Sequence, residues 1–311
     1  MADKVYKCPP VLFIVFNRPK LTQIVFNQIR SARPPKIYIA CDGPRINRED
    51  DCYLIQEVKA ICENIDWPCE VFNLTRDVNL GCKKAVSSAI YWFFENESEG
   101  IILEDDCKPH INFFQYCGVL LEKYKNDDRV GVISGSSLCD MRKKDFIWNN
   151  EDFIFSYYPS IWGWASWRRV WRDYDVSISS WPSRKKDFLS LYPNLKLAKI
   201  NYKILNKIYS GNLDTWDYQL SYMLWVTSRL AITPRINLIE NIGFGPNATH
   251  TKLENHTLAK MSLMHIENLN FPLTPPSSYI PNLSYKLFIE KFATRSILCK
   301  VLERTGLNLY R

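Results

Sequence analysis

The chain lacks the features that mark several common classes of protein. None of its ten cysteines forms a C-x-x-C pair, so the sequence shows no sign of a zinc site or of a disulfide framework. No apolar run is long enough to span a bilayer, the N-terminus lacks the apolar core of a signal peptide, and there is no internal repeat. Most cysteines lie in apolar patterns, among them Cys41, Cys62 and Cys117. We therefore expect a cytosolic protein with buried thiols.

The chain also lacks a strong excess of charge. A formal net charge of +7 over 311 residues is too small and too dispersed to indicate a nucleic acid partner. It suits anionic small molecules or an anionic membrane surface. Hydrophobic residues make up 46% of the chain, which is enough for a sizeable core. The length fits one large domain with a trailing segment.

The most informative stretch that is present runs from Ile101 to Asp106. It is an apolar run, typical of the end of a buried strand, and it stops at three consecutive carboxylates. Adjacent carboxylates repel one another, and a hard cation such as Mg²⁺ or Mn²⁺ would explain them. Such an ion takes few protein carboxylates and completes its shell with phosphate oxygens. A solvated acidic turn is the alternative interpretation.

Strands alternate with helices through the first half of the chain. Apolar periodicity predicts strands at 11–16, 36–41, 70–74, 101–104 and 130–134, and helices near 21–29, 52–65, 83–94 and 113–124. Such alternation implies a mostly parallel sheet covered on both faces, with ligands bound beyond the carboxyl ends of its strands. Arg18, Asp42 and the acids Glu104 to Asp106 all follow strands. We expect them on one rim.

The character of the sequence changes near Trp148. Five tryptophans crowd residues 162–181, either as a core lid or as an aromatic surface for sugars or bases. Late strands are predicted at 230–233 and 236–240, followed by a glycine-containing loop. The last basic helix, near 285–304, either lies on an anionic membrane leaflet or docks on the main domain or a partner subunit.

Several motifs stand in an order that resembles one enzyme family. Asn17-Arg18-Pro19 follows the first strand, Asp42 the second, and Glu104-Asp105-Asp106 the acid-tipped strand, with Trp162-Gly163-Trp164 and Thr215-Trp216-Asp217 later. This ordered set resembles the GT-A-fold glycosyltransferases.

The likeness is closest to two groups within that family. Residues 102–109, with Phe113 and Phe114, resemble the acidic-motif region of the N-acetylglucosaminyltransferase I type. Bacterial nucleotide-diphospho-sugar transferases of surface-polysaccharide pathways carry a loop similar to residues 241–251, and the resemblance covers roughly residues 9 to 255.

The resemblance implies an α/β fold of the GT-A type. This fold is a Rossmann-like three-layer α/β/α sandwich with a mostly parallel central sheet, here followed by a C-terminal helical appendage. The catalytic domain would span residues 1–260, with a nucleotide-sugar half to about 147 and an acceptor half from about 148. Residues 261–311 would form a proline-containing connector and the basic helix.

The resemblance also implies an activity. The chain would be a metal-dependent, inverting glycosyltransferase of the hexosyl- or N-acetylhexosaminyltransferase class. It would move a sugar from a nucleotide-diphospho-sugar, most often a UDP-sugar, to a saccharide or lipid-linked glycan in surface polysaccharide synthesis. Mn²⁺ or Mg²⁺ would be the cofactor. The place of action would be the cytoplasm, with the inner face of the membrane as the site of a lipid-linked acceptor.

Two further implied roles concern the metal and the base. Asp106 would ligate the metal directly, and His250 would be a second ligand. Asp217 would be the general base that takes a proton from the acceptor hydroxyl. Asp214, three residues earlier, is a rival base if the segment is helical, because both would share one face.

Residues after the first strands would bind the nucleotide sugar; these are Arg18, Asp42, Asn79, Gly81, Lys83, Glu104 and Asp105. Asp42 would accept hydrogen bonds from the base, and Arg18 would lie by the diphosphate. Glu104 and Asp105 would hold the ribose or sugar and the water shell of the metal. The helix that begins near Cys82 would favour an anion at its N-terminus.

Aromatic residues of the second half would contact sugar. Trp162, Trp164 and Trp216 would stack on it, and Gly163 would let a ligand approach the backbone. Two other classes stay open. A sugar-phosphate nucleotidyltransferase usually carries a glycine-rich loop after its first strand, where this chain has Asn17-Arg18-Pro19. A non-catalytic sugar-binding protein would not need the intact acids.

Overall fold

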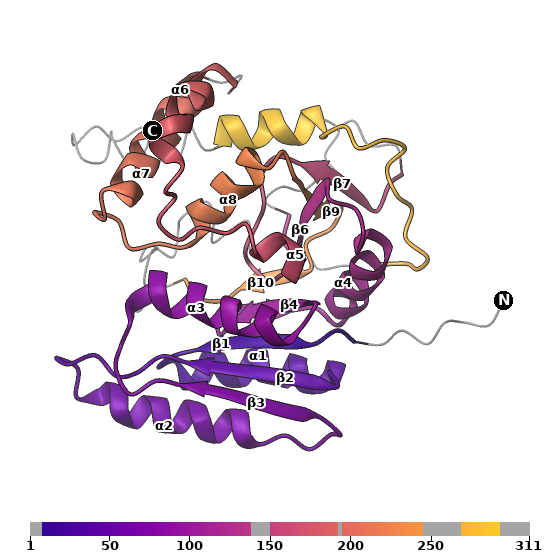
Figure 1. Ribbon diagram of the computed structural model, residues 1–311. Helices are drawn as coiled ribbons and strands as arrows, with labels where there is room; N and C mark the ends of the chain where they lie inside the picture. The colour runs from indigo at the N-terminus through magenta and orange to yellow at the C-terminus, as the bar shows by residue number, and fades with distance from the viewer. Residues whose placement is uncertain (1–7, 138–149, 192–194, 245–268, 293–311) are drawn as a thin grey trace, which may run out of the picture.

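The computed structural model describes residues 8–137, 150–191, 195–244 and 269–292 (Figure 1). Its centre is an eight-stranded sheet in the order β3-β2-β1-β4-β8-β6-β9-β7, and β10 and β5 form a separate two-stranded sheet. Helix α1 contacts α2 and α4, whereas α3 contacts α5, so the helices cover the sheet in two groups. The predicted α/β class is confirmed.

Six strands of the large sheet share one direction. They are β1 (Val11–Val15), β2 (Lys36–Cys41), β3 (Glu70–Thr75), β4 (Glu99–Glu104), β6 (Val130–Ser134) and β9 (Leu230–Pro234). Two strands run the other way, β8 (Trp164–Trp167) between β4 and β6, and β7 (Phe153–Ser156) at the edge. The mostly parallel sheet is confirmed, and its central strands are almost wholly apolar because helices cover both faces.

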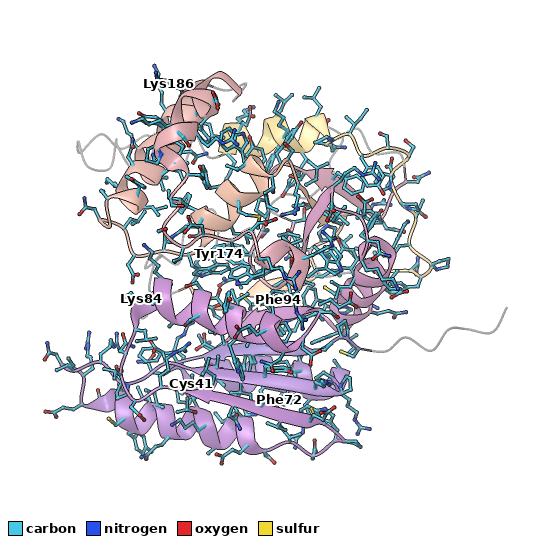
Figure 2. The ribbon with its side chains drawn as sticks, in the orientation of Figure 1. Cys41, Phe72, Lys84, Phe94, Tyr174 and Lys186 are labelled. Carbon is cyan, nitrogen blue, oxygen red and sulfur yellow. The ribbon has the colours of Figure 1, made fainter. Side chains whose placement is uncertain are left out.

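The helices of the first half follow from their apolar spacing. In α1 (Pro19–Ala32) the buried residues Thr22, Val25, Phe26 and Ile29 recur at helical intervals, and proline stands at the first helical position. The others are α2 (Asp50–Glu63), α3 (Gly81–Asn96) and α4 (Ile111–Tyr124). Cys41, labelled in Figure 2, is only 1% exposed, as expected of a buried thiol.

The tryptophan-rich segment mostly belongs to the core. Trp164 and Trp167 lie in β8, and Trp171 ends α5 (Arg168–Trp171); all three are buried. Trp181 begins α6 (Trp181–Leu191), which packs with α7 (Leu195–Tyr209) and α8 (Asp217–Val226) around a smaller cluster. The interpretation as a core lid therefore holds for these four rings.

The last predicted strand is shorter than expected. Strand β10 spans Ile239–Asn241 and pairs with β5 (Cys107–Pro109) outside the large sheet. The prediction began three residues too early because Ile236 is apolar but lies before the paired segment. This ribbon holds the chain beside the acids, since the Ile242 N–H donates to the Asp106 carbonyl at 2.8 Å.

Residues 283–292 are helical and dock on the main domain. Tyr285 and Ile289 bury their side chains against Ile154 of β7, and the Tyr158 hydroxyl donates to Glu290 at 3.0 Å. The docking expectation is thus confirmed for this part, whereas the predicted continuation to Arg304 lies outside the described residues. In the ranges given above, no helix is both long and apolar enough to cross a bilayer.

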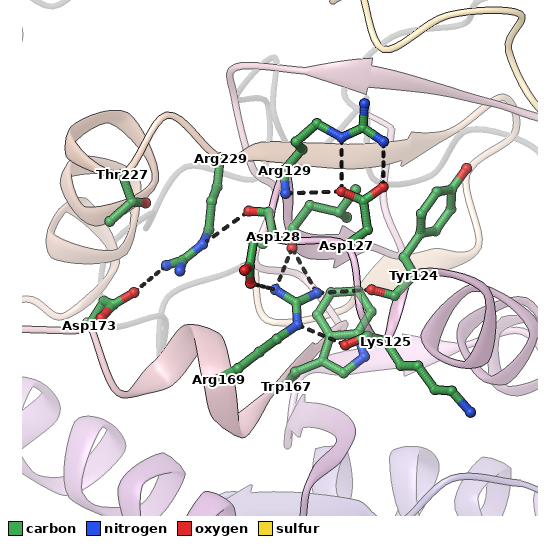
Figure 3. A network of polar contacts seen from close by, with 12 residues as sticks. Tyr124, Lys125, Asp127, Asp128, Arg129, Trp167, Arg169, Asp173, Thr227 and Arg229 are labelled. Atoms are coloured by element: carbon green, nitrogen blue, oxygen red, sulfur yellow. Dashed lines mark hydrogen bonds and ion pairs between the residues drawn. The ribbon is translucent and has the colours of Figure 1, made fainter.

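An arginine-rich network lies at the amino ends of β6 and β9 (Figure 3). Arg169 donates to the Tyr124 and Lys125 carbonyls, both at 2.9 Å, at the end of α4, where helix carbonyls lack partners of their own. Arg129 and Asp127 form a two-point ion pair beside it. Because the strands are parallel, this edge is the one opposite to the carboxyl rim.

Candidate active site

Strands β1 and β4 bring Arg18 to the predicted acids. The two strands are neighbours, with Ile14 opposite Glu104, so the residues that follow them meet at the rim. The Arg18 guanidinium donates to both Asp105 oxygens, through Nη2 and through Nε at 3.2 Å, and through Nη1 to Asp106 Oδ2 at 2.9 Å. Arg18, expected beside the diphosphate, pairs with two of the three acids in this structure.

Glu104 is the third acid and has a different environment. It is half-buried, and it has no hydrogen-bond or ion-pair partner in the part of the chain that the structure describes. Burial raises the pKa of Glu104 to about 8, with repulsion from Asp106 and Asp105 adding to it. Burial also raises the pKa of Asp105 to about 6, although Arg18 opposes that shift. One guanidinium therefore does not offset all the negative charge of the acidic tip.

Gly243 lies directly against the side chain of Asp106. A Cβ atom at this position would overlap the Asp106 carboxylate, so only glycine allows the loop to approach so closely. The next ring along, Phe244, meets the half-buried Trp162 ring edge-on at 5.8 Å. Trp162 is the predicted sugar-stacking tryptophan that lies nearest to this loop and keeps part of its surface exposed.

Asp42 holds the loop that was predicted to contact the diphospho-sugar. Its carboxylate accepts the Leu80 N–H at 3.0 Å, and the Asn79 side chain donates to the Gly43 carbonyl at 2.9 Å. Gly43 lies so close to the Val78 backbone that a Cβ would overlap it. Burial raises the pKa of Asp42, against the effect of the Leu80 hydrogen bond. In this structure, Asp42 and Asn79 fix the shape of the loop, and their contacts to a ligand stay predictions.

Asp51 ties the turn after β1 to the loop after β2, a role that sequence reasoning missed. The carboxylate is 1% exposed and accepts from the Asn17 side chain at 2.7 Å and from the Arg45 guanidinium at 2.7 and 2.8 Å. The Arg45 guanidinium also lies 5.2 Å from the Phe16 ring centre. These hydrogen bonds lower the pKa of Asp51 to about 2. No local sequence signal marks this acid among its neighbours Glu49 and Asp50.

This ion pair predicts an acid-sensitive contribution to stability. The pKa of Asp51 is lower in the folded chain than its ordinary value of 3.8, so its contribution is complete above that value and is lost as the pH falls toward about 2. We expect Asp51→Asn to be less stable than the wild type at pH 7, with the difference shrinking below pH 4. Urea unfolding of both proteins between pH 7 and pH 3 measures this, because acids common to both cancel. A difference that does not change with pH would contradict it.

The start of α3 already carries an anionic group. Gly81 has a φ of +76°, a conformation that favours glycine. The Asp214 carboxylate accepts the Lys83 N–H at 3.1 Å and sits at the helix N-terminus, where backbone donors and the helix dipole favour negative charge. The contact that Lys83 makes here is therefore through its backbone N–H. Helix α8 begins only at Asp217, so the idea that Asp214 and Asp217 share a helix face is wrong.

Asp217 lies at the first position of α8, and its charge acts on the acidic tip. Its carboxylate accepts a hydrogen bond from the Thr215 hydroxyl. Its charge contributes to raising the pKa of Glu104, as do Asp105 and Asp106. The structure thus brings the candidate base and the acids to one place, although they are far apart in sequence.

Two residues at this place were not predicted. Burial raises the pKa of the Cys82 thiol to about 12, and the charges of Glu104, Asp214 and Asp217 add to the shift, so all three act on this thiol. Tyr174 (Figure 2) stacks on Trp171 with ring centres 4.1 Å apart and donates its hydroxyl to the Trp216 carbonyl at 2.9 Å. It therefore fixes the backbone immediately before Asp217.

The remaining aromatic candidates do not offer a ring face. Trp164 and Trp216 are 1% and 3% exposed and stack on each other with ring centres 5.9 Å apart, so both belong to the core and Trp162 alone is kept for sugar contact. Gly163 has a φ of +59°, and the space beside it is filled by the Ile239 side chain. Its lack of a side chain serves packing in this structure.

The predicted metal ligands are only partly covered by the structure. His250 lies outside the described residues. Within those residues, no group of three His, Cys, Asp or Glu side chains is arranged to hold a metal ion. A hard cation that takes one protein carboxylate and completes its shell with phosphate oxygens does not need such a group. The donors present, the oxygens of Asp106 and its neighbours, fit that mode.

Fold and rim together define an α/β protein with a candidate active site at the carboxyl ends of a mostly parallel sheet. No known family and no curated protein matches the chain. Similar solved structures include HddC from Yersinia pseudotuberculosis, at 13% identity over 53% of this chain and 80% of that one, with a TM-score of 0.33.

Two further solved structures show a likeness of the same kind. The 4-diphosphocytidyl-2C-methyl-D-erythritol synthase of Anaerococcus prevotii is 9% identical over 71% of this chain and 84% of that one, with a TM-score of 0.35. A UDP-glucose pyrophosphorylase complexed with UDP-glucose is 10% identical over 82% and 97%, with a TM-score of 0.38. Likenesses this low carry no functional assignment, so the function is argued from the site.

Proposed function

We propose that the chain is a metal-dependent glycosyltransferase that uses a nucleotide-diphospho-sugar, with a UDP-sugar as the expected donor. The observation that supports this most is that Asp217, distant in sequence, lies within electrostatic range of Glu104 in the acidic tip. A transferase of this kind needs a cation-binding group for the leaving diphosphate and a separate carboxylate for the acceptor hydroxyl. Under this proposal, Asp106 would supply the first group and Asp217 the second.

The proposed roles follow from the position of each side chain. Asp106 would hold the cation, which would stabilise the negative charge that develops on the departing diphosphate. Asp42, Asn79 and Gly81 would form the wall of the nucleotide site through the loop that they fix. Trp162 would contact the transferred sugar or the acceptor beside Gly243.

Asp217 is the better of the two candidate bases. The Asp214 carboxylate is engaged with the backbone at the start of α3, where it stabilises the helix. Asp217 accepts only from the Thr215 hydroxyl among the described residues, which leaves carboxylate lone pairs for an acceptor hydroxyl. Because one base and no second carboxylate nucleophile is assigned, the proposed reaction is a single displacement that inverts the anomeric centre.

A thermal-shift screen tests the donor class. Nucleoside diphosphates and nucleotide sugars are added with Mn²⁺, with Mg²⁺ and with chelator. A ligand that binds only the folded state raises its melting temperature. We expect metal-dependent stabilisation by UDP and by one UDP-sugar. Stabilisation by UTP with a sugar 1-phosphate, and turnover to UDP-sugar, would instead support the nucleotidyltransferase alternative. No response to any nucleotide would refute the proposal.

The membrane contact of the last helix stays a separate proposal. Its outward side exposes Leu283 and Leu287, which are 63% and 56% exposed, with Ile280 just before them and Lys286 alongside. We expect flotation with anionic vesicles, reduced in a Leu283→Gln/Leu287→Gln variant and absent with neutral vesicles. Point changes are preferable to truncation, because Tyr285 and Ile289 are buried against the main domain. Equal flotation of wild type and variant would contradict the contact.

A further inference from the structure

Arg18 uses its whole guanidinium on the acidic tip. All three of its nitrogens donate to Asp105 or Asp106, and the guanidinium has no other hydrogen-bond partner in the described ranges. The side chain of Asp105 is 3% exposed, that of Asp106 is 16% exposed, and that of Arg18 is 24% exposed. The forked guanidinium of Arg18 therefore shields the two carboxylates from solvent, while part of the guanidinium itself remains exposed.

A divalent cation at the acidic tip would compete with the Arg18 guanidinium for the carboxylate oxygens of Asp105 and Asp106. Arginine keeps its proton at any accessible pH, so it cannot become neutral when a second cation arrives beside it. Like charges at close range repel strongly in a half-buried site. A cation bound through Asp106 must therefore displace Arg18 from Asp106 Oδ2 or bind against its repulsion.

We propose that Arg18 is a built-in counter-ion of the acidic tip that competes with the divalent cation for Asp105 and Asp106. The identity of the cation's second ligand, a nucleoside diphosphate, rests on the proposed function. Arg18 keeps the acids paired when no ligand is bound and makes the site weak for a cation alone. A diphosphate offers the displaced guanidinium a new anionic partner. Cation and nucleotide therefore bind together more readily than either binds alone.

The opposite view treats the fork as a fixed brace between the ends of β1 and β4, with the cation bound elsewhere on the tip. Under that view the loss of Arg18 loosens the tip and weakens cation binding. The sign of the change in cation affinity thus separates the two arrangements.

The experiment measures Mn²⁺ binding without nucleotide, from the electron paramagnetic resonance signal of free Mn²⁺, for the wild type, Arg18→Gln and Arg18→Lys. We expect Arg18→Gln to bind Mn²⁺ about tenfold more tightly, as removal of one repelling unit charge beside the ion implies. Arg18→Lys keeps the charge but not the fork, and it should fall between the two. It also serves if Arg18→Gln does not fold.

Arg129→Gln is the matched control, because it breaks the arginine–aspartate pair with Asp127 at the opposite edge of the sheet. Its Mn²⁺ affinity should equal that of the wild type. A second measurement adds saturating UDP. The ratio of Mn²⁺ affinities with and without UDP should be smaller in Arg18→Gln than in the wild type, because the variant has no counter-ion to displace.

Each possible result either supports or overturns the proposal that Arg18 competes with the cation. The counter-ion proposal is overturned if Mn²⁺ binding is unchanged or weaker in both Arg18 variants. It is also overturned if none of the proteins binds Mn²⁺. Tighter binding in Arg18→Gln supports it, whether or not UDP binds, because this arm contains no nucleotide. Failure of UDP to bind any of the proteins would instead refute the UDP-sugar as the donor in the proposed function.

Discussion

Replacement of Asp217 by asparagine is expected to lower turnover by about 10²- to 10⁴-fold, the usual contribution of a general base. Asparagine has the same shape and still accepts the Thr215 hydroxyl, but it cannot take a proton from the acceptor. The melting temperature and the affinity for UDP should stay close to those of the wild type, because the role proposed for Asp217 is contact with the acceptor and not with the nucleotide. Steady-state kinetics with the donor from the nucleotide screen and thermal denaturation measure both quantities.

Asp214→Asn is the control for this experiment, because the charge of Asp214, like that of Asp217, acts on the Cys82 thiol. It removes a negative charge from the N-terminus of α3, which costs about 0.3 to 1 kcal/mol of stability. Turnover should fall far less than in Asp217→Asn. If Asp214→Asn abolished turnover and Asp217→Asn kept it, the two roles would have to be exchanged.

Replacement of Asp106 by asparagine is expected to abolish the metal-dependent part of nucleotide binding. In the wild type, UDP at about 100 times its dissociation constant should stabilise the fold by about 2.7 kcal/mol. In Asp106→Asn the stabilisation by UDP should be the same with Mn²⁺ as with chelator, because an amide oxygen is a poorer ligand for a hard cation than a carboxylate. Thermal shifts with and without Mn²⁺ measure the difference.

Asp127→Asn, in the arginine network at the opposite edge, is the matched control for Asp106→Asn. It removes an aspartate that is likewise paired with an arginine and should leave the Mn²⁺-dependent shift intact. Persistence of the full Mn²⁺-dependent shift in Asp106→Asn would show that another group carries the cation.

The first half of the fold could be predicted because its signals are local. Strand β2 and strand β6 lie at the predicted residues, and α4 begins at Ile111 after His110, whose side chain accepts the Asn112 N–H at 3.3 Å and caps the helix. Apolar runs and helical periodicity determine these elements without distant partners. Arg18 and the acids meet on one rim for the same reason, since each follows a parallel strand.

In the second half, the strand predicted at 230–233 is confirmed as β9, but other elements escaped prediction because they depend on distant partners. Strands β8 and β7 have four residues each, and β8 consists largely of tryptophan and small residues that carry no clear period. Strand β10 forms only because Cys107–Pro109 offers it a partner. The burial of Trp164 and Trp216 likewise follows from their contact with each other across more than one element.

The candidate site likewise has features that the sequence predicts and features that it does not. Residue types and positions on the rim were readable, but their mutual contacts were not. The hydrogen bond from the Leu80 N–H to Asp42 and the bond from the Lys83 N–H to Asp214 join segments that are distant in sequence. The pairing of Asp51 with Arg45 depends on how one loop turns, and no local pattern records it. Tertiary geometry therefore determines which polar groups form hydrogen bonds within the protein and which remain available to a ligand.

The position of β8 has a consequence for how the protein is made. This strand lies between β4 and β6, yet its residues leave the ribosome after both. Until Trp164–Trp167 emerge, β4 and β6 each present a row of unpaired backbone groups, and such open edges invite pairing with other chains. Pairing across long stretches of sequence is also slow. Nascent chains that stop before β8 should therefore aggregate or bind chaperones, and the earlier strands of the sheet should become soluble only when β8 has been synthesised.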